Sequence, residues 1–138
     1  TTYLLDTNAV RDLTDNNSNV QRRLRNLQSS DRTVVCSIVL GEVLFGIERR
    51  AHGRRRNELS FRTARVLDGL PCEQITPDAA AYYAVIKADL ERLGRMKGEN
   101  DMWIAATALA LGAVLVTRDK GFDDMVVGVG LGVEDWTA

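Results

Sequence analysis

Short, mostly apolar runs recur along the chain and are separated by longer amphipathic stretches. The runs cover residues 2–5, 33–36, 72–75 and 113–116, and in all but the weak third run the apolar residues are consecutive rather than alternating. Strands that are buried on both faces of a parallel sheet have this pattern. We therefore predict four central strands at these positions, with a final edge strand at residues 132–134.

The stretches between the runs carry apolar residues at helical spacing. They predict helices over residues 11–30 (one or two helices), 37–50, 54–68, 77–93 and 99–111, with a short segment at 122–126 after the fourth strand. Strands that alternate with helices indicate a parallel sheet covered on both faces. The expected fold is α/β: a three-layer α/β/α sandwich with a mostly parallel central sheet of four to five strands.

Length and composition limit the class of protein. The chain has 138 residues, 45% of them hydrophobic, with two prolines and eleven glycines. This composition fits one folded domain over residues 1–138. The longest stretch without a charged residue begins at Met102 and is shorter than the roughly 20 residues needed to span a bilayer. With no secretory segment at the start of the sequence either, we expect no membrane association and a cytoplasmic location.

The net charge of −1 conceals an uneven distribution of charge. Residues 1–65 have 12 basic and 7 acidic side chains, whereas residues 66–138 have 6 basic and 12 acidic ones. A local basic surface attracts phosphates whatever the total charge of the protein. A polyanionic partner is therefore compatible with this near-neutral chain.

Four acidic residues lie next to predicted strand ends, at a predicted helix start or within a strongly apolar helix. Asp6 ends the first strand, Asp119 follows the fourth, and Asp101 opens the helix that leads into the fourth strand. Glu42 is surrounded by apolar residues on every side of its helix, which predicts a buried carboxylate that needs a partner. Each acid alone has an ordinary explanation: a helix cap for Asp6 and Asp101, a turn for Asp119, a salt bridge for Glu42.

Together the four acids suggest a metal site. In a parallel sheet they can converge on one edge, where ligands commonly bind. Clustered carboxylates repel one another unless a cation neutralises them. Oxygen ligands without clustered cysteine or histidine suit Mg²⁺ or Mn²⁺ rather than zinc. Such sites most often act on phosphate esters.

Several motifs follow one another along the chain: LLDTN at 4–8, SIVLGEVLFG at 37–46, GENDMWIAA at 98–106 and LVTRD at 115–119, with Phe122 and VEDW at 133–136. These motifs resemble the PIN-domain family, and most closely the VapC toxins of bacterial toxin–antitoxin pairs. The order and spacing of these motifs make the resemblance specific, and it extends over nearly the whole chain.

The resemblance implies a metal-dependent endoribonuclease with Asp6, Glu42, Asp101 and Asp119 in its acidic pocket. Asp6 and Asp101 match the positions most firmly tied to Mg²⁺, for which Mn²⁺ can substitute. Glu42 and Asp119 match positions that complete the pocket, hold a second ion or orient the attacking water. Neighbouring polar residues are candidates for hydrogen bonds that orient these acids: Thr7, Asn8, Ser37, Asn100 and Thr117.

The same resemblance implies partners. Members of the family cleave RNA, often a tRNA, are inhibited by a VapB antitoxin, and usually form homodimers that assemble further with the antitoxin. Basic residues on either side of the acids are candidate phosphate contacts: Arg92, Arg95 and Lys97 before the Asn100–Asp101 motif, and Arg54 and Arg55 in the densest basic stretch.

Two other functions fit parts of the sequence. A phosphatase-like α/β domain would use Asp6 as a nucleophile, but such domains need a second acid nearby, and here position 8 is asparagine. Glu42 also has no role in that chemistry. A non-catalytic module could instead use the acidic pocket to bind a basic peptide. Binding without turnover of RNA would distinguish this module from an enzyme.

Overall fold

The structure is a computed structural model that describes residues 1–125 and 130–138. Its strands are β1 (Thr2–Leu5), β2 (Arg32–Cys36), β3 (Cys72–Glu73), β4 (Val114–Val116) and β5 (Val133–Glu134). Its helices are α1 (Thr7–Thr14), α2 (Ser18–Arg25), α3 (Ser37–Glu48), α4 (Arg54–Asp68), α5 (Pro77–Leu93), α6 (Glu99–Leu111) and the 3-10 helix η1 (Lys120–Met125).

The strands form one sheet in the order β3-β2-β1-β4-β5, and every neighbouring pair is parallel. In the centre of the sheet, Leu4 lies opposite Val34 on one side and Leu115 on the other. All three side chains are completely buried. The predicted α/β sandwich with a parallel sheet is confirmed, and the edge strand near residue 133 belongs to it.

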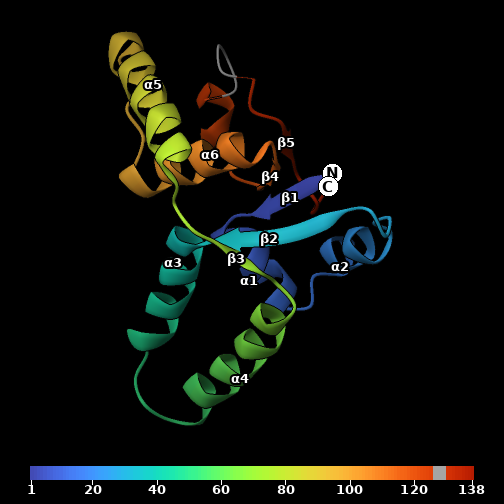
Figure 1. Cartoon of the computed structure of the whole chain (residues 1–138). Coiled ribbons are helices and arrows are strands. Elements are labelled where there is room, and N and C mark those ends of the chain that lie inside the picture. Colours follow the sequence, from blue (N-terminus) through green and yellow to red (C-terminus); the bar gives the residue numbers. More distant parts are fainter. Residues whose placement is uncertain (126–129) are drawn as a thin grey trace.

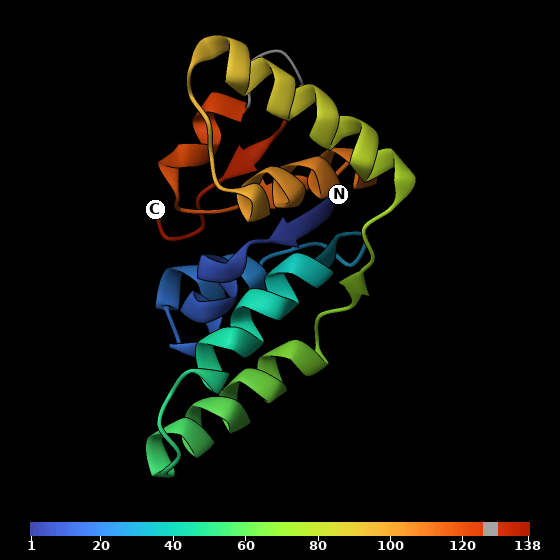
Figure 2. The same ribbon diagram turned by 90° about the vertical axis from the view of Figure 1, so that its left-hand side faces the viewer.

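Helices cover both faces of this sheet (Figure 1). Helices α5 and α6 lie on one face, and α1, α2 and α4 lie on the other. Helix α3 contacts both α1 and α6 and so connects the two layers (Figure 2). This position of α3 brings side chains from three helices to one end of the sheet.

Local signals set where several helices begin and end. The side chains of Asp6, Asn17 and Thr76 accept hydrogen bonds from backbone N–H groups in the first turns of α1, α2 and α5. Gly94 and Gly112 follow α5 and α6 with φ of 66° and 62°, a conformation that glycine adopts readily. The predicted start of a helix at Thr76–Pro77 is therefore correct.

Some predicted boundaries were wrong. The stretch 11–30 forms the end of α1 and the whole of α2, because α1 begins directly after the cap at Asp6. The third strand is only two residues long. The segment predicted at 122–126 is part of η1, and Val126 lies outside the described residues. None of the described helices has the length and apolarity to cross a membrane.

The prediction that α3 is buried on every side was also wrong. Only Val39, Val43 and Ile47, which share one face of the helix, are buried. On the opposite side Leu44 is 46% exposed and Phe45 is 63% exposed. Helix α3 is therefore apolar on two faces, of which one is buried in the core and the other is exposed in the single chain.

Candidate active site

Four acidic side chains line one hollow of about 210 Å³: Asp6, Glu42, Asp101 and Asp119. Asp6 follows β1 and Asp119 follows β4, and these two strands are neighbours in the sheet. Asp101 lies in the first turn of α6, and Glu42 lies in the middle of α3. The structure thus brings together all four acids that the sequence analysis singled out.

Asp6 is both a helix cap and a wall of the hollow. Its Oδ1 accepts a 2.8 Å hydrogen bond from the backbone N–H of Ala9, and its Oδ2 accepts one of 2.5 Å from Thr117 Oγ1. Burial raises the pKa of Asp6 to about 6, and the charges of Asp119 and Asp101 act in the same direction, whereas the two hydrogen bonds lower it. Asp6 therefore caps α1 and lines the hollow at the same time.

Glu42 is held by two neutral partners from other helices. Thr7 Oγ1 donates a 2.6 Å hydrogen bond to Oε1, and Asn100 Nδ2 lies 3.4 Å from Oε2. The carboxylate is half-buried rather than buried as predicted, because its side of α3 opens onto the hollow. None of the ion pairs formed within residues 1–125 and 130–138 includes Glu42, so the salt-bridge explanation does not apply in this part of the chain.

Asp101 and Asp119 complete the acidic wall. Burial raises the pKa of Asp101, and the negative charges of Asp119 and Glu42 raise it further, while Lys97 lowers it. Asp119 Oδ1 accepts a 2.8 Å hydrogen bond from the backbone N–H of Gly121, the turn role expected for it. The carboxylates of Asp119 and Glu42 therefore act on the charge of Asp101 within the hollow that all three line.

Three of the five predicted orienting residues touch the acids. Thr7 and Asn100 contact Glu42, and Thr117 contacts Asp6 and also accepts a 3.0 Å hydrogen bond from the backbone N–H of Asp119. Asn8 lines the hollow.

Among the residues that the structure describes, no acidic side chain accepts a hydrogen bond from Ser37. Its hydroxyl donates a 3.4 Å hydrogen bond to the carbonyl oxygen of Glu73 and lies 4.0 Å from Cys72 Sγ. As the first residue of α3, directly after β2, it is directed toward the neighbouring strand β3. This corrects the prediction that its hydroxyl orients an acid.

The acids share a hollow without forming a tight cluster. Across the described parts of the chain, no three His, Cys, Asp or Glu side chains are close enough to hold one metal ion between them. Mg²⁺ commonly takes only one or two carboxylates and keeps several waters or substrate oxygens. The spacing of the acids is therefore suited to an ion that protein, water and substrate share.

The predicted phosphate contacts lie outside this hollow. Four of them form surface ion pairs: Arg92 with Asp89, Arg95 and Lys97 with Asp124, and Arg54 with Glu58. Arg55 is exposed. Surface ion pairs contribute only about 0–1 kcal/mol, so a phosphate can displace them. Contact with RNA at these five positions stays a prediction.

Sequence reasoning missed Arg11, which lines the hollow together with the acids. It follows Thr7 by four residues in α1, so the two side chains lie on the same face of the helix. This spacing from the LLDTN motif is a signal that could have identified it.

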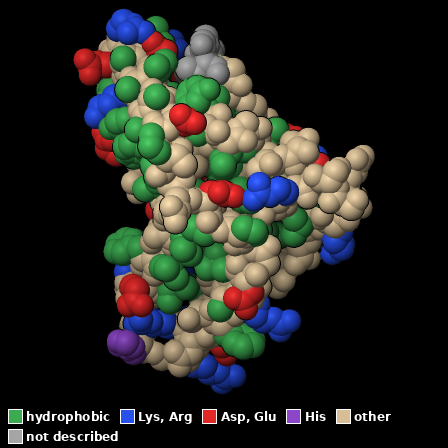
Figure 3. Space-filling view, viewed as in Figure 1, with side chains coloured by type: hydrophobic (Ala, Val, Ile, Leu, Met, Phe, Trp, Pro, Cys, Tyr) green, Lys and Arg blue, Asp and Glu red, His purple; other side chains and the backbone are tan. Residues whose placement is uncertain are grey.

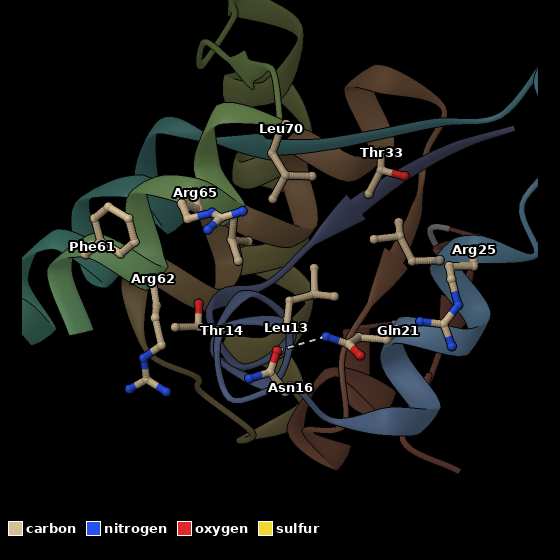
Figure 4. A pocket seen from close by; sticks show the side chains of 13 residues that line it. Leu13, Thr14, Asn16, Gln21, Arg25, Thr33, Phe61, Arg62, Arg65 and Leu70 are labelled. Atoms are coloured by element: carbon tan, nitrogen blue, oxygen red, sulfur yellow. Dashed lines mark hydrogen bonds between the residues drawn. The ribbon is translucent and has the colours of Figure 1, made fainter. Parts of the chain in front are cut away.

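A larger groove of about 690 Å³ lies apart from the acids, between α1, α2 and α4 (Figure 4). Apolar side chains from all three helices line it, among them Leu13, Leu24 and Val66. Three arginines line it as well: Arg25, Arg62 and Arg65. Its apolar and basic character differs from that of the acidic hollow.

Comparison with known proteins places this arrangement in a family. A family model for the PIN domain matches residues 3–127. The chain is 35% identical to Ribonuclease VapC1 of Haemophilus influenzae strain R2866, with 98% of each chain covered. It is 30% identical to Ribonuclease VapC2 of H. influenzae strain Rd, with 97% of each covered.

Solved structures have the same fold. One is VapBC2 from Rickettsia felis bound to a DNA fragment from their promoter, with a TM-score of 0.88, 25% identity and 99% of each chain covered. Another is VapBC-1 from nontypeable Haemophilus influenzae, with a TM-score of 0.87, 27% identity and 100% of each chain covered. The fold, the acidic hollow and these similarities agree: the chain belongs to the PIN-domain family and, within it, to the VapC ribonucleases.

Proposed function

We propose that this chain is a metal-dependent endoribonuclease that hydrolyses RNA phosphodiester bonds at the four-acid hollow. The observation that carries the proposal is the convergence of Asp6, Glu42, Asp101 and Asp119 on one hollow at the end of a parallel sheet. The relatives named as VapC ribonucleases support an RNA substrate. The activity is that of a toxin, because it destroys RNA that the cell needs.

The residues of the hollow fit a hard divalent cation. Its acidic side chains offer oxygen donors only, and neither cysteine nor histidine is among the described residues that line it. Burial raises the pKa of Asp6 and of Asp101, and the charges of neighbouring carboxylates raise both pKa values further, so a bound cation would offset that repulsion. Asp6 and Asp101 would hold Mg²⁺, or Mn²⁺ in its place, with Glu42 and Asp119 completing the site.

When bound, the ion would polarise the phosphoryl group and lower the pKa of a bound water. The residues of this chain fix the carboxylates for that task. Thr117 and the backbone of Ala9 orient Asp6, and Thr7 and Asn100 orient Glu42. The Glu42 and Asp119 carboxylates line the same hollow and would accept hydrogen bonds from the attacking water.

The substrate we propose is a tRNA or another structured RNA in the cytoplasm. Aromatic residues make up only 6% of the chain, so few bases can be held by stacking. Recognition would rest mainly on phosphates and on RNA shape.

Chelation tests the metal requirement. Cleavage of total tRNA by the purified chain should stop in EDTA and resume when Mg²⁺ or Mn²⁺ is added in excess. Cleavage that continues in EDTA would overturn the metal-dependent mechanism. Stoichiometric binding without cleavage under any metal condition would favour the binding module over the enzyme.

A VapB-type antitoxin is the proposed protein partner. The solved VapBC structures with this fold support such a partner. The groove between α1, α2 and α4 suits it, because an amphipathic helix can place apolar residues against Leu13 and Val66 and acidic residues against Arg62 and Arg65. Phe61 lies at this groove and is 64% exposed, so a partner could bury it.

We also propose a homodimer that assembles further with the antitoxin. Large apolar side chains are exposed on α3 and α5, at Leu44, Phe45, Tyr82 and Val85. Both helices lie on the side of the molecule that faces the viewer in Figure 2, and hydrophobic side chains are visible over both in Figure 3. Exposed apolar surface of this kind marks interaction sites. A second copy would cover it with the same surface, as two-fold symmetry requires.

A further inference from the structure

Arg11 stands where three hollows meet. It lines the acidic hollow, a second hollow of about 600 Å³ along α3, and a third of about 210 Å³ farther along the same helix. Glu42 lines both the acidic hollow and the second hollow, and Arg49 lines both the second hollow and the third. Taken in this order, the three hollows trace a path from the carboxylates along α3, and Arg11 borders each of them.

The position of the Arg11 side chain depends on Gly46 in α3. A Cβ atom at position 46 would lie 3.3 Å from Arg11 Nη2, closer than such contacts usually are. Glycine inside a helix costs about 1 kcal/mol relative to alanine. Here its lack of a side chain lets the guanidinium lie directly against α3, beside the path.

The charge of Arg11 is available for a ligand. Of the described residues that line the acidic hollow, it is the one base. It forms no ion pair with any of the residues that the structure describes, and neither does Arg49. By contrast, Arg92, Arg95 and Lys97 all have acidic partners. Two unpaired arginines along a path that begins at a nuclease pocket suit a polyanion.

We propose that Arg11 and Arg49 bind successive phosphates of the RNA strand on one side of the scissile phosphate, so that the strand runs from the acidic hollow along α3. This rests on the proposed ribonuclease function and adds the direction of the bound strand. A guanidinium can donate two parallel hydrogen bonds to a phosphate. Arg11, next to the acids, contacts the phosphate adjacent to the cleaved bond, and Arg49 contacts one farther away.

The test measures RNA binding separately from cleavage. The Asp101→Asn variant serves as the background, and the probe is a fluorescently labelled single-stranded RNA followed by anisotropy in Mg²⁺ at several salt concentrations. Adding Arg11→Gln should weaken binding about tenfold, as loss of a charged hydrogen bond does. It should also reduce the slope of log Kd against log salt by about 0.7, the value for one phosphate contact on a single strand.

Matched variants make the result specific. Arg49→Gln should reduce the slope in the same way, and Arg22→Gln, an exposed arginine of α2, should leave both Kd and slope unchanged. Gly46→Ala, which crowds the guanidinium, should weaken binding to a smaller extent. Thermal unfolding checks that each variant is folded, and the exposed Arg49 provides the test if Arg11→Gln is not.

The two hypotheses fail in different ways. RNA binding with unchanged Kd and slope in folded Arg11→Gln and Arg49→Gln variants would overturn the proposed path while leaving the nuclease intact. A wild-type chain that neither binds nor cleaves RNA would overturn the ribonuclease function itself. A loss of affinity without a change in slope would show that Arg11 acts on the carboxylates rather than on a phosphate, and would also overturn the path.

Discussion

Thr117 Oγ1 donates a 2.5 Å hydrogen bond to Asp6 Oδ2 and so joins the residues that directly follow two neighbouring strands, β4 and β1. Asp6 is only 4% exposed and Thr117 only 3%. The same hydroxyl accepts a hydrogen bond from the backbone N–H of Asp119. The Thr117 hydroxyl therefore forms hydrogen bonds with two of the four acids, with the side chain of Asp6 and with the backbone of Asp119.

Removing this hydroxyl should alter the titration of the site. In Thr117→Val the carboxylate of Asp6 loses a hydrogen bond that lowers its pKa, so its pKa rises above about 6. The rising limb of the pH–rate profile for RNA cleavage should move to higher pH. Folding stability should fall by about 1–2 kcal/mol because Asp6 keeps a buried oxygen without its partner.

Thr107→Val is the matched control for this variant. Its hydroxyl is equally buried but donates to the backbone carbonyl of Trp103, away from the acids. We expect a loss of stability without a change in the pH profile. If both variants shift the profile equally, Thr117 has no particular influence on Asp6.

The raised pKa of Asp6 predicts how stability depends on pH without metal. The pKa rises from about 3.8 to about 6 on folding, so the folded chain binds the proton more tightly. Protonation of Asp6 therefore stabilises the folded state. This stabilisation is fully present below the pKa of Asp6 in the unfolded chain and is lost as pH rises through its pKa in the folded chain, over about pH 4 to 6. The same effect can be stated for the ionised form: at higher pH, ionised Asp6 makes the fold less stable than protonated Asp6 would, by about 3 kcal/mol at most.

Asp6→Asn removes this titration. In EDTA the variant should equal the wild type in free energy of unfolding at about pH 4 and exceed it by about 2–3 kcal/mol at about pH 8. Urea unfolding at both pH values measures the difference. A difference that is the same at both pH values would show that the carboxylate is not destabilised by burial.

The groove beside α4 should be required for binding the antitoxin. Phe61→Glu places a negative charge beside the apolar lining, near Arg62 and Arg65. Affinity for a VapB-type antitoxin, measured by calorimetry, should fall about tenfold or more, because exposed aromatic residues often dominate an interface. Undiminished affinity in a folded Phe61→Glu variant would place the antitoxin elsewhere.

The exposed face of α3 and α5 should form the dimer. The double variant Leu44→Glu/Val85→Glu should sediment as a monomer where the wild type sediments as a dimer, since four new charges would be buried across a two-fold interface. Phe61→Glu, at the groove between α1, α2 and α4, is the control and should remain dimeric. A monomeric wild type, or a dimeric double variant, would contradict this assignment.

The sheet and the position of the four acids followed from general rules. Continuous apolar runs predicted parallel strands, and acids placed after β1 and β4 must then meet at one edge, as Asp6 and Asp119 do. Glu42 was harder to place. An all-apolar helix has the same sequence pattern whether both of its faces are buried by its own chain or one stays exposed, and in α3 one face is exposed in the single chain.

Other features depend on contacts that no local pattern contains. Ser37 is the first residue of the helix that carries Glu42, but its hydroxyl is directed to β3 because β2 and β3 are paired there. Arg11 shares a helix face with Thr7, but its contact with α3 at Gly46 depends on how the two helices pack. Long-range packing therefore decided which polar residues serve the site.

Cleavage of RNA by single variants of the acidic hollow tests the central claim most directly. Purified wild type, Asp101→Ala and the control Asp78→Ala, an exposed acid in the first turn of α5, are incubated with total tRNA in Mg²⁺, and circular dichroism verifies that each is folded. Cleavage should be abolished in Asp101→Ala and retained in Asp78→Ala. Full cleavage by folded Asp101→Ala would contradict the assignment of the hollow as the active site.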